Sequence, residues 1–193
     1  MEIEEAFGMY FKKLENCSKN DPGSLLRTVY VKERDLEGLY VNGSIDQYGY
    51  VEWKPVHQKS KFDFSDLESE FGFVINEKIK RFFNSYWFVR ISGNYNGWDC
   101  SIDGNFPNVE LGDFIRRSKN HVDQHCEYMN GNYFCLGDAE SEEYGYGALY
   151  CNNSDASVIV VDWDGAYDCD FSRPVSDFTI QIADSIETLL SNL

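Results

Sequence analysis

The chain has 193 residues, of which 42% are hydrophobic and 16% aromatic, a composition that excludes a wholly disordered polymer and suffices for a buried core. No apolar run is long enough to cross a bilayer, and the acidic start of the chain lacks the features of a secretory signal, so we expect a cytoplasmic protein. The formal net charge is -16, with 12 acidic residues and one basic residue after position 133, which excludes nucleic acid and anionic lipid as partners and favours a basic protein.

Helical periodicity opens the chain. Large apolar residues recur three and four positions apart over residues 2–17, which predicts an amphipathic helix that ends at a turn formed by residues 20–23. Residues 25–31 are apolar and β-branched enough for a strand, and are equally compatible with an irregular connection. Residues 48–55 alternate in the manner of a strand, which Pro55 ends.

A pair of short helices is predicted next. Ser65 and Glu68 have the spacing of a capping box, so Ser65 should cap a helix that stops at Gly72. Asn76 should cap a second helix. The inner face of this second helix is expected to carry Ile79, Phe82, Phe83 and Tyr86.

Strands dominate the second half of the sequence. We expect strands at 87–91, 98–102, 133–136, 146–152 and 157–163, and helices at 109–127 and 176–190. Asp164 and Gly165 form the strongest hairpin motif, which would place residues 166–171 antiparallel to the preceding strand. Sequential strands flanked by helices predict an α+β fold with a mainly antiparallel central sheet. We expect one domain over residues 1–193, made of an N-terminal helix and turn (1–23) and a sheet-and-helix body (24–193).

Two histidines four positions apart suggest a zinc site. His121 and His125 would share one helix face, as zinc ligands do. A metalloprotease also needs a glutamate directly after the first histidine, and Val122 stands there instead, so the hydrolase interpretation fails. A structural zinc with Cys126 or Asp123 remains as an alternative to plain surface histidines.

The acidic segment 162–170 has a superficial likeness to a calcium loop, because hard cations want several oxygen ligands close together. An EF-hand loop that began at Asp162 would need a glutamate at its twelfth position, where Arg173 stands. Alternating acids also fit one solvated face of a hairpin, which is the interpretation we favour. We therefore predict no metal or other cofactor.

Nothing in the sequence selects a catalytic site. The chain contains no nucleophile elbow, no Walker loop and no dinucleotide-binding glycine motif, and no spacing singles out a pair of carboxylates. The chain shows no secretion signal, and its cysteines are not spaced as close metal ligands, which predicts reduced thiols. They are Cys17, Cys100, Cys126, Cys135, Cys151 and Cys169. We expect a protein that is not an enzyme.

Carboxylates and aromatic rings gather between residues 138 and 170. Tyrosine and tryptophan supply much of the binding energy of protein interfaces, and carboxylates around them would pair with arginine and lysine of a partner. The alternative is that about half of the rings face the core and that the acids serve only solubility. The predicted partner-binding residues are Asp138, Glu140, Glu142, Glu143, Tyr144, Tyr146, Asp162, Trp163, Asp164, Asp168 and Asp170.

The order of motifs provides a further hypothesis. After the N-terminal helix come an aromatic strand ending in Trp-x-Pro, an acidic helix with a small turn, a second helix with bulky apolar residues, and closing strands before a last helix. These motifs occupy residues 36–40, 50–55, 66–72, 75–83, 146–150, 158–161 and 176–190. Over nearly the whole chain, this order resembles the Syd (SecY-interacting) proteins, a branch of the SUKH superfamily.

The resemblance implies a SUKH-like α+β fold without catalytic residues that binds other proteins. Many members of the superfamily are immunity proteins that neutralise bacterial toxins, often nucleases, whereas Syd proteins bind the basic cytoplasmic face of the SecY channel. Residues 138–143 and 162–170 are expanded and more acidic than the Syd pattern, which favours an immunity protein with a basic toxin as partner. The alternative is a translocon regulator, located peripherally at the cytoplasmic face of the bacterial inner membrane.

Overall fold

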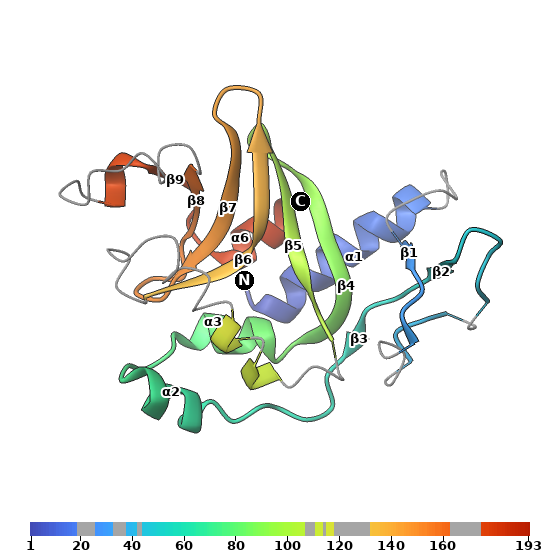
Figure 1. Ribbon diagram of the computed structural model, residues 1–193, viewed down its shortest axis with the longest axis horizontal. Helices are drawn as coiled ribbons and strands as arrows, with labels where there is room; N and C mark the ends of the chain where they lie inside the picture. The colour runs from blue at the N-terminus through green and yellow to red at the C-terminus, as the bar shows by residue number, and fades with distance from the viewer. Residues whose placement is uncertain are drawn as a thin grey trace.

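An antiparallel sheet dominates the structure (Figure 1). The computed structural model describes residues 1–18, 26–32, 38–41, 44–106, 111–113, 115–117, 132–162 and 175–193. Seven strands follow one another in the order β3-β4-β5-β6-β7-β8-β9, and each pairs antiparallel with its neighbour. The α+β fold with a mainly antiparallel central sheet is thus confirmed.

The strands differ greatly in length, and the longest ones lie at the centre of the sheet. They are β3 (Val56–His57), β4 (Tyr86–Tyr95), β5 (Trp98–Asn105), β6 (Tyr133–Ser141), β7 (Gly145–Asn152), β8 (Val158–Asp162) and β9 (Thr179–Ala183). A separate two-stranded sheet consists of β1 (Arg27–Val29) and β2 (Tyr50–Glu52). This small sheet lies on the right in Figure 1, on the opposite side of the molecule from β8 and β9.

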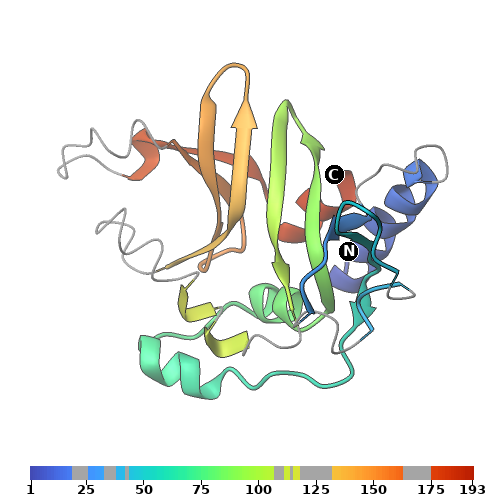
Figure 2. The ribbon, with the colours of Figure 1, turned by 45° about the vertical axis from the view of Figure 1, so that its right-hand side comes forward.

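Helices α1 (Ile3–Ser18) and α6 (Ile186–Asn192) pack on one face of the sheet, called here the inner face, and the other helices lie below its lower end and at its β8–β9 edge (Figure 2). These other helices are α2 (Ser65–Phe71), α3 (Glu77–Phe83) and the 3₁₀ helix η3 (Val175–Asp177). Residues 111–113 and 115–117 are also helical, which confirms the described part of the helix predicted at 109–127. In the described part of the chain, every helix is too short or too polar to span a bilayer.

Aromatic side chains join α1, α3 and the sheet. Phe7 of α1 stacks on Phe82 of α3, with ring centroids 5.7 Å apart and planes 17° apart. Phe7 also packs against Phe88 of β4, at a centroid distance of 5.7 Å. All three rings are buried, and burial of each contributes about 1.5–3 kcal/mol. The helical periodicity of residues 2–17 therefore reflects a real buried stripe.

The hairpin between β4 and β5 corrects the predicted end of β4. The sequence predicts an end at Ile91, because the residues after it are rich in turn formers. In the structure β4 runs on to Tyr95, which pairs with Trp98. The two residues between them, Asn96 and Gly97, have φ angles of 53° and 83°. Two successive positive φ angles make the tight turn that matches the twist of paired strands, so the flanking residues stay in the ladder.

Strand β6 was also predicted too short. The sequence predicts an end at Leu136. The strand instead continues to Ser141, and only residues 142–144 turn the chain into β7. The register of the β6–β7 pair shifts by one residue between Cys135 and Gly137, which identifies a β-bulge. Glycine inside a strand often marks such a bulge.

The predicted C-terminal helix at 176–190 is wrong in its first half. That segment forms η3 and β9, and α6 begins only at Ile186. Its N-cap is Ser185, whose hydroxyl accepts a hydrogen bond from the Thr188 N–H at 3.2 Å. The pattern Thr-Ile-Gln-Ile over β9 is β-branched and alternates with period two, which favours a strand once β8 offers a partner.

One of the two predicted helix caps is confirmed. Asn76 caps α3 and accepts a hydrogen bond from the Lys78 N–H at 3.0 Å. The predicted capping box of α2 is wrong: Phe64 holds the N-cap position without a side-chain cap, and the Ser65 hydroxyl donates to Asp63. The Asp63 carboxylate lies just before the helix and accepts the Ser65 hydroxyl, so this hydroxyl does not cap the backbone N–H groups of α2.

Several predictions lie wholly or partly outside the described residues. These include the hairpin at 163–171, the remainder of the helix at 109–127 and two of the six cysteines, Cys126 and Cys169. The other four, Cys17, Cys100, Cys135 and Cys151, carry thiols rather than disulfides. The single-domain prediction over residues 1–193 stays a prediction.

Candidate functional site

Polar side chains cover the outer face of the sheet along β4 to β7. Strand register aligns them in rows that cross the strands: in one row, Asn94 pairs with Asp99, Asp99 with Glu140, and Glu140 with Tyr146. A shallow hollow of about 500 Å³ lies over these rows. We call this surface the acidic face, and its residues are Arg90, Ser92, Asn94, Asp99, Ser101, Asp138, Glu140 and Tyr146.

The acidic face holds like charges directly opposite one another. Asp99 and Glu140 are register partners on adjacent strands, where Cβ atoms lie about 4.5–5.5 Å apart and like charges are destabilising. The Asn94 side-chain amide donates to Asp99 at 2.9 Å. Among the described residues that line the hollow, Arg90 is the one cation, and its Nε donates to the Ser101 hydroxyl at 2.7 Å. The face therefore keeps a surplus of negative charge.

Two tyrosines beside these carboxylates are exposed and held in place. Tyr144 and Tyr146 are 51% and 54% exposed. A hydrogen bond to the Asp138 carboxylate raises the pKa of Tyr146 to about 12. A hydrogen bond to Glu143 likewise raises the pKa of Tyr144. Tyr150, in contrast, is buried. The alternative that about half of the rings face the core therefore holds for Tyr150 but not for Tyr144 and Tyr146.

The tips of the two central hairpins enclose a second acidic hollow. The β4–β5 and β6–β7 tips lie side by side at the top of Figure 1, and the hollow between them has a volume of about 580 Å³. Its carboxylates are Asp99, Glu140, Glu142 and Glu143. On its wall, Trp98 stacks on Tyr144, with ring centroids 5.7 Å apart and planes 11° apart. Negative charge and aromatic surface thus meet at these tips.

The structure brings together the predicted site residues of the β6–β7 hairpin. Asp138, Glu140 and Tyr146 lie on the acidic face, and Glu142, Glu143 and Tyr144 lie in the turn at its edge. Asp162 ends β8, where it pairs with Gly147. The other predicted residues lie outside the described part of the chain; they are Trp163, Asp164, Asp168 and Asp170.

Asn94 and Asp99 complete the rows and are absent from the residues predicted to bind a partner. Asp99 follows Trp98 in a strand that alternates between buried and exposed residues, so its outward direction was visible in the sequence. The pairing of Asp99 with Glu140 is not visible in the sequence, because the register between β5 and β6 is set by the fold. Asn94 lay in a segment that was interpreted as a turn.

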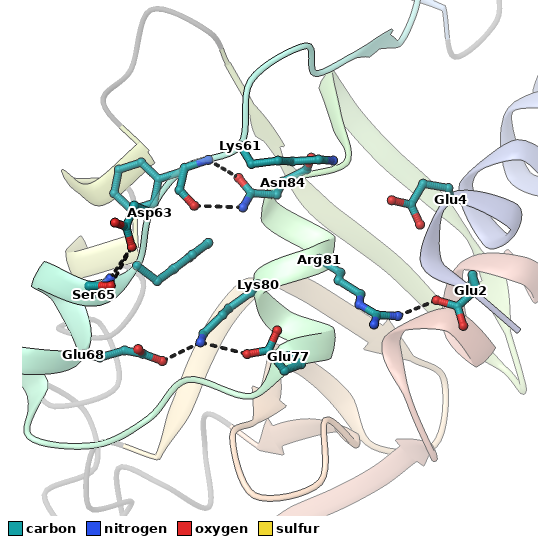
Figure 3. Close-up of a pocket in the computed structure, with 12 residues that line it drawn as sticks. Glu2, Glu4, Lys61, Asp63, Ser65, Glu68, Glu77, Lys80, Arg81 and Asn84 are labelled. Carbon is teal, nitrogen blue, oxygen red and sulfur yellow. Dashed lines mark hydrogen bonds and ion pairs between the residues drawn. The ribbon is translucent and has the colours of Figure 1, made fainter.

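A mixed-charge pocket of about 530 Å³ lies elsewhere, among α1, α2 and α3 (Figure 3). Lys80 bridges Glu68 and Glu77, with N···O distances of 2.7 and 2.9 Å. Its hydrogen bond to Glu68 lowers the pKa of that carboxyl and raises the pKa of Lys80. Arg81 pairs with Glu2. These charges satisfy one another within the chain, so we assign this pocket a structural role in joining the helices.

Three of the four described cysteines, Cys100, Cys135 and Cys151, are poorly suited to nucleophilic chemistry. Burial raises the pKa of the Cys100 and Cys135 thiols to about 12, and raises that of Cys151 well above its usual value. Thiolate is the reactive form, so these thiols are inert near neutral pH. Among the described residues, no three His, Cys, Asp or Glu side chains are grouped to hold a metal. His121, His125 and Cys126 lie outside those residues.

The acidic face offers fixed rings and carboxylates on a shallow surface. Neither the protein-family models nor the curated proteins compared with this chain give a match. The likeness to Syd and SUKH proteins therefore stays a hypothesis from motif order.

Replacing Glu140 by glutamine is expected to raise the free energy of unfolding by about 0.2–1 kcal/mol, because it removes the repulsion with Asp99. Urea unfolding at low salt would measure the gain, which should shrink as salt screens the charges. Glu52→Gln is the matched control, since Glu52 is an exposed strand residue opposite Arg27 and should lose stability or stay unchanged. A loss of stability in Glu140→Gln would contradict the assigned repulsion.

Proposed function

We propose that the protein is a non-catalytic binding module that docks a basic protein on its acidic face. The observation that carries the proposal is the row in which Asp99 lies opposite Glu140, with exposed Tyr146 beside them. Opposed carboxylates reduce the stability of the free protein, and a partner's arginine or lysine placed between them would remove that repulsion.

The exposed rings support the same proposal. Tyr144 and Tyr146 offer large contact areas, and their hydrogen bonds to Glu143 and Asp138 restrict the rings before any partner arrives. Little side-chain entropy would then be lost on binding, which is a property of residues that dominate interface energetics. The surrounding negative charge would speed the encounter with a basic surface.

We infer further that the partner is a toxin and that the protein is an immunity protein of SUKH type. A toxin that acts on nucleic acid needs a positively charged groove for phosphates. Rows of carboxylates spaced by the strands of a sheet present the opposite charge over an extended area, and so fit such a groove. Occupation of the groove would block the toxin without any chemical step by the immunity protein.

Reversing two charges at the edge of the acidic face is expected to abolish protection. Cells that make the toxin encoded beside this protein should grow when the wild-type protein is co-expressed, and should not grow with Glu140→Lys and Glu142→Lys together. In stopped-flow binding at low salt, the double variant should associate at least about tenfold more slowly, and the difference should narrow as salt rises.

The matched control reverses two exposed charges of α1, Glu5→Lys with Glu15→Lys, on the opposite side of the sheet. This control should protect and associate like the wild type. Equal protection by both double variants would refute the acidic face as the binding surface. Absence of protection by the wild-type protein, together with sedimentation that depends on the SecY channel, would instead assign the protein to the translocon.

A further inference from the structure

An apolar pocket adjoins the tips of the central hairpins. It has a volume of about 250 Å³ and is lined by residues of β5, β7, β8 and β9 and by the β6–β7 turn. Trp98, Val160 and Phe178 form much of its wall and are themselves at least 94% buried, so packing behind them fixes its shape. Pockets for whole small-molecule ligands hold about 300–1,000 Å³, and this smaller volume suits a single side chain.

The apolar pocket and the acidic hollow share one wall. Trp98 and Tyr144 line both, and their stacked rings separate the apolar interior from Glu142 and Glu143. The Tyr144 N–H donates to the Ser141 hydroxyl at 2.9 Å, which helps to fix the turn that carries the ring. An apolar group in the pocket would therefore lie one ring pair away from several carboxylates.

We propose that this pocket receives a large apolar side chain of the basic partner, and that a lysine or arginine next to that side chain enters the acidic hollow. The inference rests on the proposed function and names the partner's anchor. Charge complementarity identifies the occupant: carboxylates on one side of the Trp98–Tyr144 wall require a cation, and the apolar lining on the other side excludes one.

This arrangement accounts for specificity as well as for affinity. Carboxylates alone would attract any basic surface, whereas a pocket beside them accepts only a surface with an apolar side chain at the correct distance. A buried anchor surrounded by polar contacts is the usual composition of an interface hot spot. The pocket thus distinguishes a cognate partner from other cationic proteins.

Two peptides of equal charge test the inference. Each has four lysine or arginine residues around a central residue, which is alanine in one peptide and leucine in the other. We expect the leucine peptide to bind the wild-type protein about tenfold more tightly by isothermal titration at low salt, because its larger side chain leaves water. Equal affinities would overturn the pocket and leave the proposed function standing, whereas a failure of both peptides to bind would contradict the proposed function itself.

Two variants test whether the tighter binding of the leucine peptide comes from the pocket. Ile180→Phe enlarges a partly buried residue of the pocket, and Tyr144→Ala removes its shared wall. Both should abolish the tenfold preference for leucine. The alanine peptide should bind Ile180→Phe as it binds the wild type, whereas Tyr144→Ala also removes a proposed contact residue and should weaken both peptides. The matched controls are Ile45→Phe and Tyr48→Ala, which change exposed residues near the β1–β2 sheet and should keep the preference. A preference that persists in both pocket variants, with unchanged circular dichroism, would overturn the inference.

Discussion

Replacing Phe82 by alanine is expected to lower the free energy of unfolding by about 3–5 kcal/mol. Phe82 is 2% exposed and lies at the centre of the aromatic cluster. It stacks on Phe7 and meets Phe83 and Phe88 edge-on, at centroid distances of 5.2 and 6.1 Å. The deletion would leave a cavity at the junction of α1, α3 and β4, where helices from distant parts of the sequence fix one another and cannot easily collapse.

Urea unfolding followed by circular dichroism would measure this loss. Tyr48→Ala is the control, because Tyr48 is 75% exposed and its removal should change stability by no more than about 0.5 kcal/mol. The peptide affinities of Phe82→Ala, measured where it remains folded, should equal those of the wild type. If Phe82→Ala lowered the free energy of unfolding by less than about 1 kcal/mol, the aromatic cluster would contribute less to stability than its packing indicates.

The parts of the fold that could be predicted from sequence are those whose information is local. The helix at residues 2–17 was evident because a 3.6-residue period needs only one apolar stripe, which Phe7 and its neighbours supply. The Asn76 cap was evident because a cap acts within three residues. Both patterns depend only on residues that are close together in the sequence.

The C-terminal segment could not be predicted because its local pattern is ambiguous. Phe178 and Ile182 are four residues apart, as in a helix, and Ile180 between them also completes an alternating strand. Strand β8 decides between helix and strand. Its Val160 pairs with Ile180, so the backbone of this segment forms hydrogen bonds to β8 instead of helical hydrogen bonds within itself. A tertiary contact therefore overrides local preference here.

The candidate site divides in the same way. The cluster of acids between residues 138 and 143 is visible in the sequence, which places it in a loop. The structure instead places Asp138 and Glu140 on one face of β6. The contribution of Asp99 depends on strand register, which links residues far apart in the chain. The position of the bulge is equally hidden in the sequence, although the outward direction of Asp138 and Glu140 depends on it.

The bulge at Gly137 determines which residues of β6 face outward. Phe134 and Leu136, two residues apart, both belong to the core, so an unbroken strand would direct Asp138 into the core as well. The shift in register reverses the alternation, which places Ala139 in the core and turns Asp138 outward to the Tyr146 hydroxyl. The same strand can therefore carry both core residues and the acidic face.

Gly137→Ala is accordingly expected to lower the free energy of unfolding by about 2–6 kcal/mol, because strain and overpacking add. Gly137 has a φ angle of 150°, and a Cβ atom there would lie 2.1 Å from the carbonyl oxygen of Ser101 on β5. Neither backbone can move away without breaking the β5–β6 ladder. Urea unfolding would measure the loss, and binding of the basic alanine peptide to the folded fraction should weaken as the carboxylates lose their alignment.

Gly49→Ala separates the two causes of this loss. Gly49 also has a positive φ angle, of 84°, but a Cβ atom there would meet nothing within 4 Å. It should cost only the backbone strain of about 1–2 kcal/mol and leave peptide binding unchanged. If Gly137→Ala cost no more than Gly49→Ala, the close approach to Ser101 would carry no energy. The outward alignment of Asp138 and Glu140 would then need a cause other than the glycine at the bulge.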